Sequence, residues 1–378
     1  MPTFRVHLEP LGRTIVAAAE RSVLDAALGA GINLPHSCKA GHCTSCRAQL
    51  LEGEIAYPGD RLPLGLTAAE AAGGRVLLCQ ARARSDLVVR TRQVMRAGSG
   101  VPASAGGSAG AAAGATAAME EPALPETAPE ELEIQRLPCR IDAKTLLAPD
   151  VMQLWLRLPA AEKLAFRAGQ YLDVLVDGGK RRSFSIASPP HDAGRLELHV
   201  RRSPGGGWTQ ALFEAMPVGT LLRIEAPIGQ FVYERSARPL LLVAGGTGFA
   251  PLKAMLRQVL EVEHATRPLH LYWGGRSALD VYEAGTVRDW AARHPNLRFV
   301  AVLSDAGAVA SAPRDAGVEW REGWVHEVAA RELGASLAAH DVYVAGPPAL
   351  VEAVRAAYPP LGVAPDDIHF DSFDYAPR

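Results

Sequence analysis

Residues 1–96 alternate between hydrophobic and polar positions in short runs that are typical of strands. Ser22, followed three residues later by the acid Asp25, predicts a helix start, and Gly31 predicts the end of that helix. The strand-like runs occupy residues 4–8, 14–16, 76–79 and 87–89. This mixture of short strands and one capped helix predicts a small α+β domain.

The hydrophobic pattern changes twice further along the chain. Short strand-like runs punctuated by Gly and Pro come first, and they predict a barrel or a sandwich. They occupy residues 152–158, 171–176, 184–187, 196–200 and 221–224. From residue 240, apolar strands alternate with helix-like stretches, which indicates a parallel sheet covered on both faces. We expect strands at 240–243, 270–273, 298–303 and 342–345, and helices at 252–262 and 350–358.

The stretch between the first two patterns has a different composition. Residues 97–134 contain six Glu, no Lys or Arg and no aromatic residue, and most of the remainder is Ala, Gly, Ser and Pro. Such a segment buries too little apolar surface to offset the entropy of ordering it, so it predicts a flexible linker. The expected domains are therefore residues 1–96, 135–236 and 237–378, joined by the linker at 97–134.

Composition narrows the possible functions. The chain has 378 residues, 48% of them hydrophobic, and a net charge of −2, which excludes wholesale disorder and gives no reason to expect nucleic acid or an anionic membrane as a partner. Residues 1–96 carry 12 Lys and Arg against eight Asp and Glu, a net of +4. No stretch has the character of a signal peptide or a membrane span, so we expect a cytoplasmic protein.

Four of the five cysteines form a pattern with a specific chemistry. The first three follow C-x4-C-x2-C, and the fourth comes after a gap of 32 residues, which is the plant-type spacing for a [2Fe–2S] cluster. Gly41 lies inside the loop and permits the positive φ that such a loop needs. A structural zinc site and a set of buried free thiols are the alternatives, and neither predicts this spacing. The expected ligands are Cys38, Cys43, Cys46 and Cys79.

A possible nucleotide site lies in the middle part of the chain. Arg182 offers a charge for a pyrophosphate, Phe184 a flat ring, and Ser185 a hydroxyl for a ring nitrogen. Glycines ending at Gly207 precede a helix start with Thr209, where backbone N–H groups favour a phosphate. The alternative is a hairpin with a glycine cluster and a core phenylalanine.

A second signature begins where an apolar strand runs into glycines and then into a helix with Pro251 in its first turn. This strand–turn–helix order suits a dinucleotide phosphate site, although the G-x-G-x-x-G spacing is absent. A later strand ends at Gly346 and Pro347, so two glycine loops are expected at one edge of the sheet. The alternative is a purely structural pair of turns. The residues of the first loop are Gly245, Gly246, Thr247 and Gly248.

With these motifs in order, the chain resembles the iron–sulfur flavoprotein reductases. Residues 1–96 resemble a plant-type ferredoxin of β-grasp fold, and the part from about residue 135 resembles the ferredoxin–NADP reductase superfamily, an FAD-binding antiparallel barrel followed by a parallel α/β nicotinamide-nucleotide domain. The sequence resembles the reductases that serve oxygenases and, more closely, those of 3,6-dideoxysugar synthesis (CDP-6-deoxy-Δ3,4-glucoseen reductases). The segments nearest to the latter are 190–192, 196–202 and 271–276.

The resemblance implies electron transfer from NADH, or from NADPH, through FAD and a [2Fe–2S] cluster to an acceptor protein, either an oxygenase or a dehydratase component. It also implies a monomer. Ser185 and Phe373 are then expected at the reacting ring of the flavin. The flavin-binding set would be Arg182, Phe184, Ser185, His199, Val200, Arg201, Gly207 and Thr209. The nucleotide-binding set would be Gly245, Gly246, Thr247, Gly248, Pro251, Arg276, Asp280, Gly346 and Pro347.

Several positions depart from the family pattern. Phe184 stands where Tyr is usual, Ala345 where Cys is frequent, and Thr44 where Gly is frequent in the cluster loop. The change at Ala345 leaves open a second hypothesis, a non-catalytic [2Fe–2S] carrier or redox sensor with an impaired nicotinamide site. The choice of nucleotide is also open, because Arg276 suits a 2′-phosphate whereas Asp280 suits the free ribose of NADH.

Overall fold

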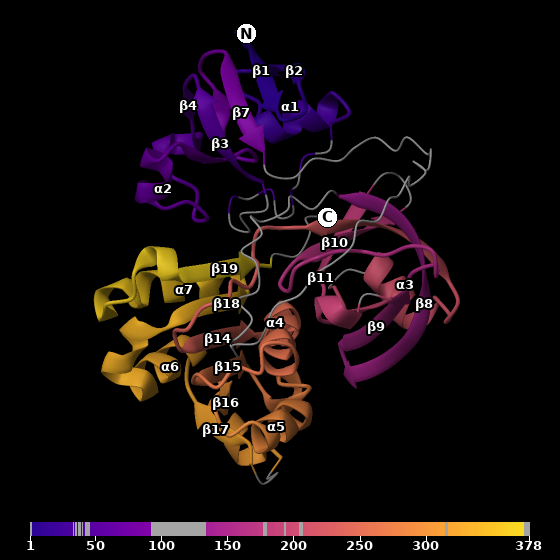
Figure 1. Cartoon of the computed structure of the whole chain (residues 1–378), viewed down its shortest axis with the longest axis vertical. Helices are drawn as coiled ribbons and strands as arrows, with labels where there is room; N and C mark the ends of the chain where they lie inside the picture. Colours follow the sequence, from indigo (N-terminus) through magenta and orange to yellow (C-terminus); the bar gives the residue numbers. More distant parts are fainter. Residues whose placement is uncertain are drawn as a thin grey trace, which may run out of the picture.

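The computed structural model describes residues 2–32, 34, 36, 39, 41, 46–91, 134–176, 180–192, 194–203, 207–313 and 317–373. Figure 1 shows an N-terminal body at one end of the molecule, with a barrel and a second sheet side by side beneath it. Most of the predicted linker lies outside the described residues. Its last residue, Ile134, is buried in a small cluster with Tyr171 and Ile228.

The N-terminal body is a mixed five-stranded sheet with helix α1 packed against β2. Its elements are β1 (Thr3–Glu9), β2 (Arg13–Ala18), α1 (Val23–Gly29), β3 (Arg47–Glu52), β4 (Ile55–Ala56), α2 (Ala68–Ala72), β5 (Arg75–Leu77), β6 (Arg82–Ala83) and β7 (Leu87–Thr91). The strand order is β2-β1-β7-β3-β5, and β1 and β7 pair in parallel. The predicted helix start is confirmed, because Ser22 Oγ accepts a hydrogen bond from Asp25 N at 3.1 Å.

The middle body is the predicted antiparallel barrel. Its elements are β8 (Gln135–Ala148), β9 (Val151–Arg157), β10 (Tyr171–Val176), β11 (Lys180–Ser185), β12 (Arg195–Arg201), α3 (Trp208–Glu214) and β13 (Leu221–Ile228). The strand order is β11-β10-β13-β8-β9-β12 with every pair antiparallel, and a bridge between Ile186 and Leu198 closes the sheet. Cys139, outside the cysteine motif, is a buried core residue as expected, and burial raises the pKa of its thiol to about 12.

The C-terminal body is the predicted parallel sheet. Its elements are β14 (Leu240–Gly245), α4 (Phe249–Glu261), β15 (Leu269–Gly275), α5 (Ala284–Arg293), β16 (Leu297–Leu303), β17 (Glu319–Glu322), α6 (Val325–Leu333), β18 (Asp341–Gly346), α7 (Pro348–Ala357) and β19 (Ile368–Ser372). The strand order is β17-β16-β15-β14-β18-β19, and all neighbours run in parallel. Successive strands are added on one side of β14 up to β17 and on its other side from β18 onward, so the strand order reverses between β14 and β18. Open α/β sheets bind ligands at such a point.

Alternate residues of β14 explain why both faces of this sheet are covered. Leu240 and Leu242 pack into the cluster that contains α4, while Leu241 and Val243 pack into the cluster with α6 and α7. A strand buried on both faces must be apolar throughout, as this one is. The carboxyl ends of β14 and β18 are left free at one edge.

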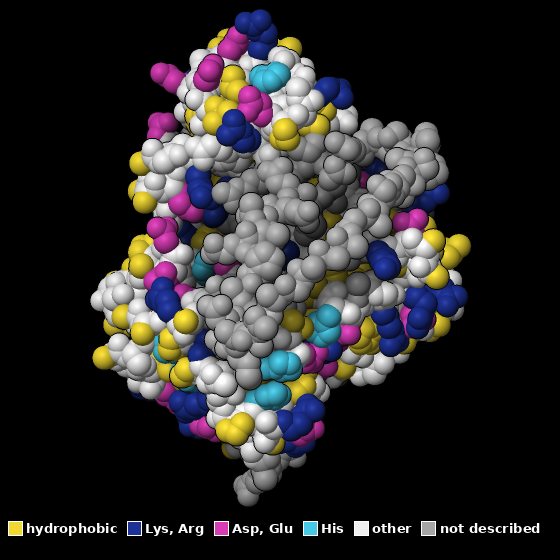
Figure 2. All heavy atoms as spheres, in the orientation of Figure 1, with side chains coloured by type: hydrophobic (Ala, Val, Ile, Leu, Met, Phe, Trp, Pro, Cys, Tyr) yellow, Lys and Arg dark blue, Asp and Glu magenta, His cyan; other side chains and the backbone are white. Residues whose placement is uncertain are grey.

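In the part of the chain that the structure describes, no helix is both long and apolar enough to cross a bilayer. Figure 2 shows basic and acidic side chains interspersed over the visible face, without a single-sign patch on its described residues.

Candidate functional site

Two of the four predicted cluster ligands lie together at the base of the N-terminal sheet. Cys46 and Cys79 are both buried, and the backbone N–H of Cys79 donates to Cys46 Sγ at 3.4 Å. A backbone N–H aimed at a cysteine sulfur is the contact that stabilises a thiolate ligand of an iron–sulfur cluster. Cys38 and Cys43, and with them Thr44, lie outside the described residues. The observed pair fits a [2Fe–2S] site.

Gly41, between the first two predicted ligands, has the left-handed conformation predicted for it. Gly41 has φ +81°, and a Cβ there would lie 2.8 Å from Pro63 and 2.9 Å from Gln80. Gly65 N also donates to the Gly41 carbonyl at 2.7 Å. Only glycine satisfies both the dihedral and the space, so this position fixes the course of the loop.

The residues predicted to hold a flavin gather around the end of β11. The Phe184 ring lies 5.4 Å from the Trp208 ring, which brings the two halves of the motif together. Ser185 pairs across the sheet with Tyr171, and Arg182 pairs with Val174 on the same strand β10. Gly207 has φ +81° and open space where a Cβ would stand, directly before α3. A half-buried ring, a hydroxyl and an open glycine turn fit an isoalloxazine and its phosphates.

Four further predicted flavin residues lie in or beside strand β12 and helix α3. Val200 is fully buried in the barrel core, and the His199 ring is enclosed by protein. Thr209 is also buried, and its Oγ accepts a hydrogen bond from Ser203 N at 3.0 Å. Arg201 points out of the barrel instead, toward Gly246 of the nucleotide domain.

The two glycine loops meet at the carboxyl edge of the parallel sheet, as predicted. Gly246 has φ +52° and Gly346 has φ +151°. A Cβ on Gly248 would lie 2.0 Å from the Ala345 carbonyl, and one on Gly245 would lie 2.9 Å from Pro347. Part of the glycine requirement is therefore the close packing of the loops against each other. Gly246 is the loop glycine whose Cβ position meets only a side chain, that of Arg201.

The remaining nucleotide residues lie around the same crevice. Pro251 is in the first turn of α4, as expected. Phe373 N donates to the Gly346 carbonyl at 2.9 Å, and its ring packs on the core cluster that contains Ala345. Ala345 itself is fully buried. Thr247 lies within the short turn between Gly246 and Gly248 that leads into α4.

Asp280 and Arg276, the two candidates for choosing the nucleotide, have different surroundings. Asp280 Oδ1 accepts from Arg201 at 2.9 and 3.0 Å, and Oδ2 accepts from the backbone N–H groups of Arg276 and Ser277. Burial opposes its ionisation, but these hydrogen bonds outweigh burial and hold the pKa of Asp280 below its usual value. The side chain of Arg276 is exposed at the edge.

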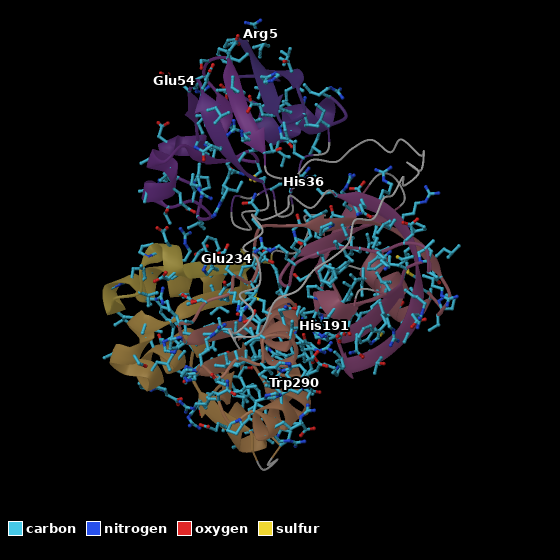
Figure 3. All side chains as sticks on the ribbon, viewed as in Figure 1. Arg5, His36, Glu54, His191, Glu234 and Trp290 are labelled. Carbon is cyan, nitrogen blue, oxygen red and sulfur yellow. The ribbon has the colours of Figure 1, made fainter. Side chains whose placement is uncertain are left out.

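The N-terminal body contacts both other bodies with the face that carries its cluster loop. Tyr171 Oη donates to the His36 carbonyl at 3.0 Å, and Gln230 Nε2 donates to the Arg47 carbonyl at 3.3 Å. Leu64 lies against α7 and β19, where it lines a small pocket with residues of both elements. Figure 3 shows His36 at the edge of the N-terminal body that faces the barrel. His36 is therefore held against β10, the strand whose Tyr171 pairs with Ser185 of β11.

The comparisons with known proteins agree with this arrangement. Family models match a 2Fe-2S iron–sulfur cluster binding domain at residues 6–84, an oxidoreductase FAD-binding domain at 138–233 and an oxidoreductase NAD-binding domain at 242–356. Reductase component 2 of terephthalate 1,2-dioxygenase from Comamonas is 34% identical, with 99% of this chain and 98% of that protein covered. The chain belongs to the iron–sulfur flavoprotein reductases.

Other members of these reductases act with different partners. A CDP-6-deoxy-L-threo-D-glycero-4-hexulose-3-dehydrase reductase of Yersinia pestis is 30% identical over 98% of both chains. The crystal structure of a cytochrome P450 reductase of Amycolatopsis has a TM-score of 0.65 at 32% identity, with 98% of both chains covered. The β-grasp, barrel and parallel-sheet architecture predicted from the sequence is thereby confirmed.

The function shared by this family is NAD(P)H-dependent electron transfer through FAD and a [2Fe–2S] cluster, and this chain is such an oxidoreductase. The alternative of a non-catalytic carrier or sensor is set aside. The residues gathered around the end of β11 would hold FAD, which would convert the two electrons of a nicotinamide hydride into single electrons for a cluster held by the cysteine ligands. The chain's own residues hold the two sites adjacent to each other.

Some residues at the contacts between bodies were not predicted from the sequence. Tyr171 was assigned only to a strand and Gln230 only to a loop, and their roles arise from contacts that no local pattern encodes. Lys253 of α4 is buried and pairs with Glu197 of the barrel. It is flanked by apolar residues at 249–252 and 254–256, and a charge among them was the local signal available for it.

Proposed function

We propose that this reductase draws electrons from NADH and delivers them to the oxygenase component of a multicomponent oxygenase. The observation that carries the proposal is the hydrogen bond from Tyr171 to the His36 carbonyl, because it holds the cluster loop beside the flavin strand. The cluster is then the last carrier before the acceptor. The acceptor must therefore take electrons singly from a protein surface.

The choice of acceptor class is supported by the relatives. Two terephthalate 1,2-dioxygenase reductase components, at 34% and 33% identity, and an aromatic O-demethylase reductase subunit of Amycolatopsis, at 34%, cover 96% or more of this chain. The dehydrase reductases are 30% identical. These identities favour an oxygenase partner over a sugar dehydratase, although the short segments 190–192, 196–202 and 271–276 resemble the dehydratase reductases more closely.

The preference for NADH rests on Asp280. Its carboxylate lies at the carboxyl edge of β15, beside the exposed side chain of Arg276, and it stays ionised because its pKa is lowered. The Asp280 carboxylate at this edge disfavours the 2′-phosphate of NADPH, whereas the free ribose of NADH carries no charge there. Arg276 opposes this preference, and Arg201, which pairs with Asp280 at 2.9 Å, offsets part of the negative charge.

The test uses the full chain reconstituted with FAD and iron–sulfur cluster. Anaerobic titration with NADH and then NADPH follows the flavin and cluster absorbance, and NADH should bleach both. The reduced protein is next mixed with the oxygenase component of Comamonas terephthalate 1,2-dioxygenase or with the Yersinia dehydrase, and product is measured. Turnover by the dehydrase without turnover by the oxygenase would reverse the proposed acceptor class.

A single chain is proposed to be sufficient for this function in the cytoplasm. The cluster loop, the flavin strand and the nucleotide crevice all come from one copy, and the thiolate ligands require a reducing compartment. Light scattering after size exclusion tests the monomer, with a mass of 40.1 kDa expected.

A further inference from the structure

Helix α4 carries a stripe of charged residues that faces the barrel. Lys253, Arg257 and Glu261 are spaced four residues apart and so lie on one face of the helix. Each pairs with the barrel at 2.8 Å, and their partners in order are Glu197, Asp192 and His191. Figure 3 shows His191 between α4 and the barrel. The segments 190–192 and 196–202, singled out in the sequence, thus meet at one seam.

On the barrel side the seam is built by strand β12. Its even-numbered residues fill the barrel core, so Glu197, His199 and Arg201 project together from the opposite face. Glu197 accepts from Lys253, His199 Nδ1 lies 2.9 Å from Tyr282 Oη, and Arg201 pairs with Asp280. All three partners belong to the nucleotide domain. The outer face of β12 therefore contacts both α4 and the segment after β15.

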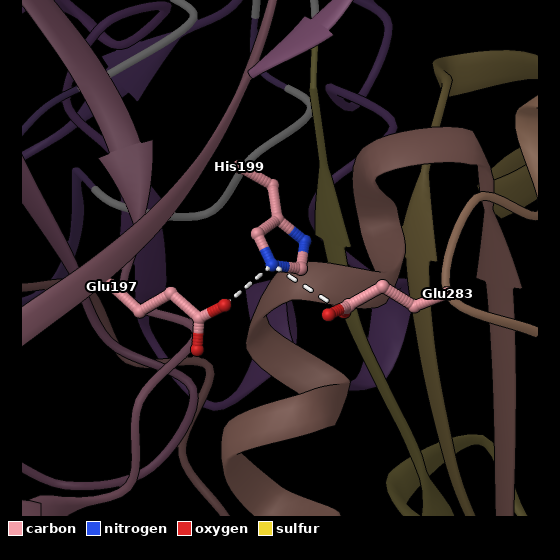
Figure 4. A group of neighbouring side chains, drawn as sticks. All are labelled: Glu197, His199 and Glu283. Atoms are coloured by element: carbon pink, nitrogen blue, oxygen red, sulfur yellow. Dashed lines mark hydrogen bonds and ion pairs between the residues drawn. The ribbon is translucent and has the colours of Figure 1, made fainter. Parts of the chain in front are cut away.

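The inner end of the seam is a buried cluster of two acids and two bases, Glu197, His199, Lys253 and Glu283. Lys253 Nζ lies 2.8 Å from Glu197 Oε1 and from both oxygens of Glu283. His199 Nε2 lies 3.1 Å from Glu197 and 3.6 Å from Glu283, as Figure 4 shows. The ammonium group occupies the space between the carboxylates, so the cluster is an ion-pair network and not a metal site.

This inner cluster is tied to the nucleotide loop. Helix α4 begins at Phe249, directly after the turn Gly246–Gly248, and the Phe249 ring stacks on Trp273 at 3.9 Å. Trp273 Nε1 donates to the Gly246 carbonyl at 3.0 Å, and the Tyr282 ring packs edge-on against Trp273. A movement of α4 relative to β12 therefore moves the turn that faces the nucleotide.

The cluster is equally close to the flavin strand. The Glu197 carbonyl accepts a hydrogen bond from Ala187 N at 2.8 Å, two residues beyond Ser185. The Glu197 backbone N–H in turn donates to Ser188 Oγ at 3.1 Å. The backbone of one residue is thus fixed to the flavin side, while its side chain is fixed to the nucleotide side.

We propose that the inner cluster fixes the position of the nucleotide loop, residues 245–248, relative to the flavin strand β11, with Lys253 and His199 as positioning residues for hydride transfer. The proposal rests on the NADH donor of the proposed function. Hydride transfer needs the reacting atoms about 3–3.5 Å apart, and a misplacement of about 1 Å costs on the order of 100-fold in rate. Lys253 acts on the reaction only through the loop that it holds.

Two variants on the same helix test this role. Lys253→Met removes the inner ammonium and keeps an unbranched stem, whereas Arg257→Met makes a similar change at an outer pair whose Asp192 side chain is 36% exposed. We expect Lys253→Met to slow NADH-driven flavin bleaching at saturating NADH by at least tenfold. Arg257→Met should stay within about twofold, since partly exposed pairs contribute little.

A second readout does not depend on turnover. Hydrogen exchange of the apoprotein should show faster exchange across β12 and the first turn of α4 in Lys253→Met only. The double variant Glu197→Gln/Lys253→Met removes one charge of each sign, so it should recover part of both effects and also serves if the single variant does not fold. Equal rates and equal exchange in Lys253→Met and Arg257→Met would overturn the proposal. Wild-type protein that NADH does not reduce would instead overturn the proposed donor.

Discussion

Removing one hydroxyl should separate the docking of the cluster from the rest of the reaction. In Tyr171→Phe the ring stays buried against Ile134 and Ile228, and the change removes the hydrogen bond to the His36 carbonyl. A neutral hydrogen bond contributes about 0.5–1.5 kcal/mol net. The equilibrium between docked and undocked cluster domain should therefore shift by about 2- to 13-fold.

Anaerobic stopped flow measures the two electron-transfer steps separately. NADH is mixed with the holoprotein, and flavin and cluster absorbance are followed together. Flavin bleaching should be unchanged in Tyr171→Phe, because that step uses the seam with the nucleotide domain, while cluster bleaching should slow by up to about tenfold. Adding Gln230→Leu removes the second docking bond and should deepen the loss.

Tyr233→Phe is the matched control for this prediction. Its hydroxyl donates to Glu263 at 2.8 Å, within the reductase part and away from the cluster domain, so cluster bleaching should match the wild type. Unchanged cluster bleaching in the Tyr171→Phe/Gln230→Leu double variant would refute the reasoning. The docked arrangement would then not be the one through which electrons pass.

Three further predictions concern stability and assembly. Gly41→Ala strains a residue at φ +81° and meets Pro63, so iron content per chain should fall, and full iron loading would contradict this account. Burial raises the pKa of Asp173 from its ordinary 3.8 to about 6, so ionising this carboxyl above pH 6 costs up to about 3 kcal/mol of folding stability, which is regained as the pH falls toward 4. Asp173→Asn should therefore raise the urea midpoint at pH 7.5 and not at pH 4. An unchanged midpoint at pH 7.5 would argue against this cost. Burial beside His340 lowers the pKa of His270 to about 4, so folding stability that is present above pH 6.5 should be lost toward pH 4, by about 1–2 kcal/mol for this half-buried group. Hydrogen exchange of β15 measures this loss, and His270→Gln should reduce it. An identical loss in the variant would assign the effect to other groups.

The chemistry in the chain could be predicted from local sequence because it depends on spacing. The cysteine pattern, the left-handed Gly41 and the Ser22 helix cap are fixed by residues a few positions apart, and each has the predicted conformation where the structure describes it. The apolar strand β14 was equally clear, since burial on both faces removes polar residues from it. Local rules suffice where the partner groups are neighbours in sequence.

Other elements escaped prediction for identifiable reasons. Strand β8 contains Pro138, and proline within a run argues against a strand, yet Gln135–Arg140 pair with β13 on one side and Arg140–Ala148 pair with β9 on the other. His199 read as a cofactor residue because it lies in a family-like segment, but its ring is enclosed by the seam. The pairing of Lys253 with Glu197 spans 56 residues and two domains, so no periodicity reports it. Contacts between domains were the part that sequence alone did not supply.

The order of the barrel strands explains how two electron-transfer steps use one flavin site. β11 lies between β10, whose Tyr171 contacts the cluster loop, and the bridge to β12, whose outer face grips the nucleotide domain. We therefore expect the donor to approach the end of β11 from the β12 side and the cluster from the β10 side. The docked position of the N-terminal body is set by Tyr171 and Gln230 and by the contact of Leu64 with α7 and β19, so contacts between bodies define where the cluster domain lies against the flavin strand.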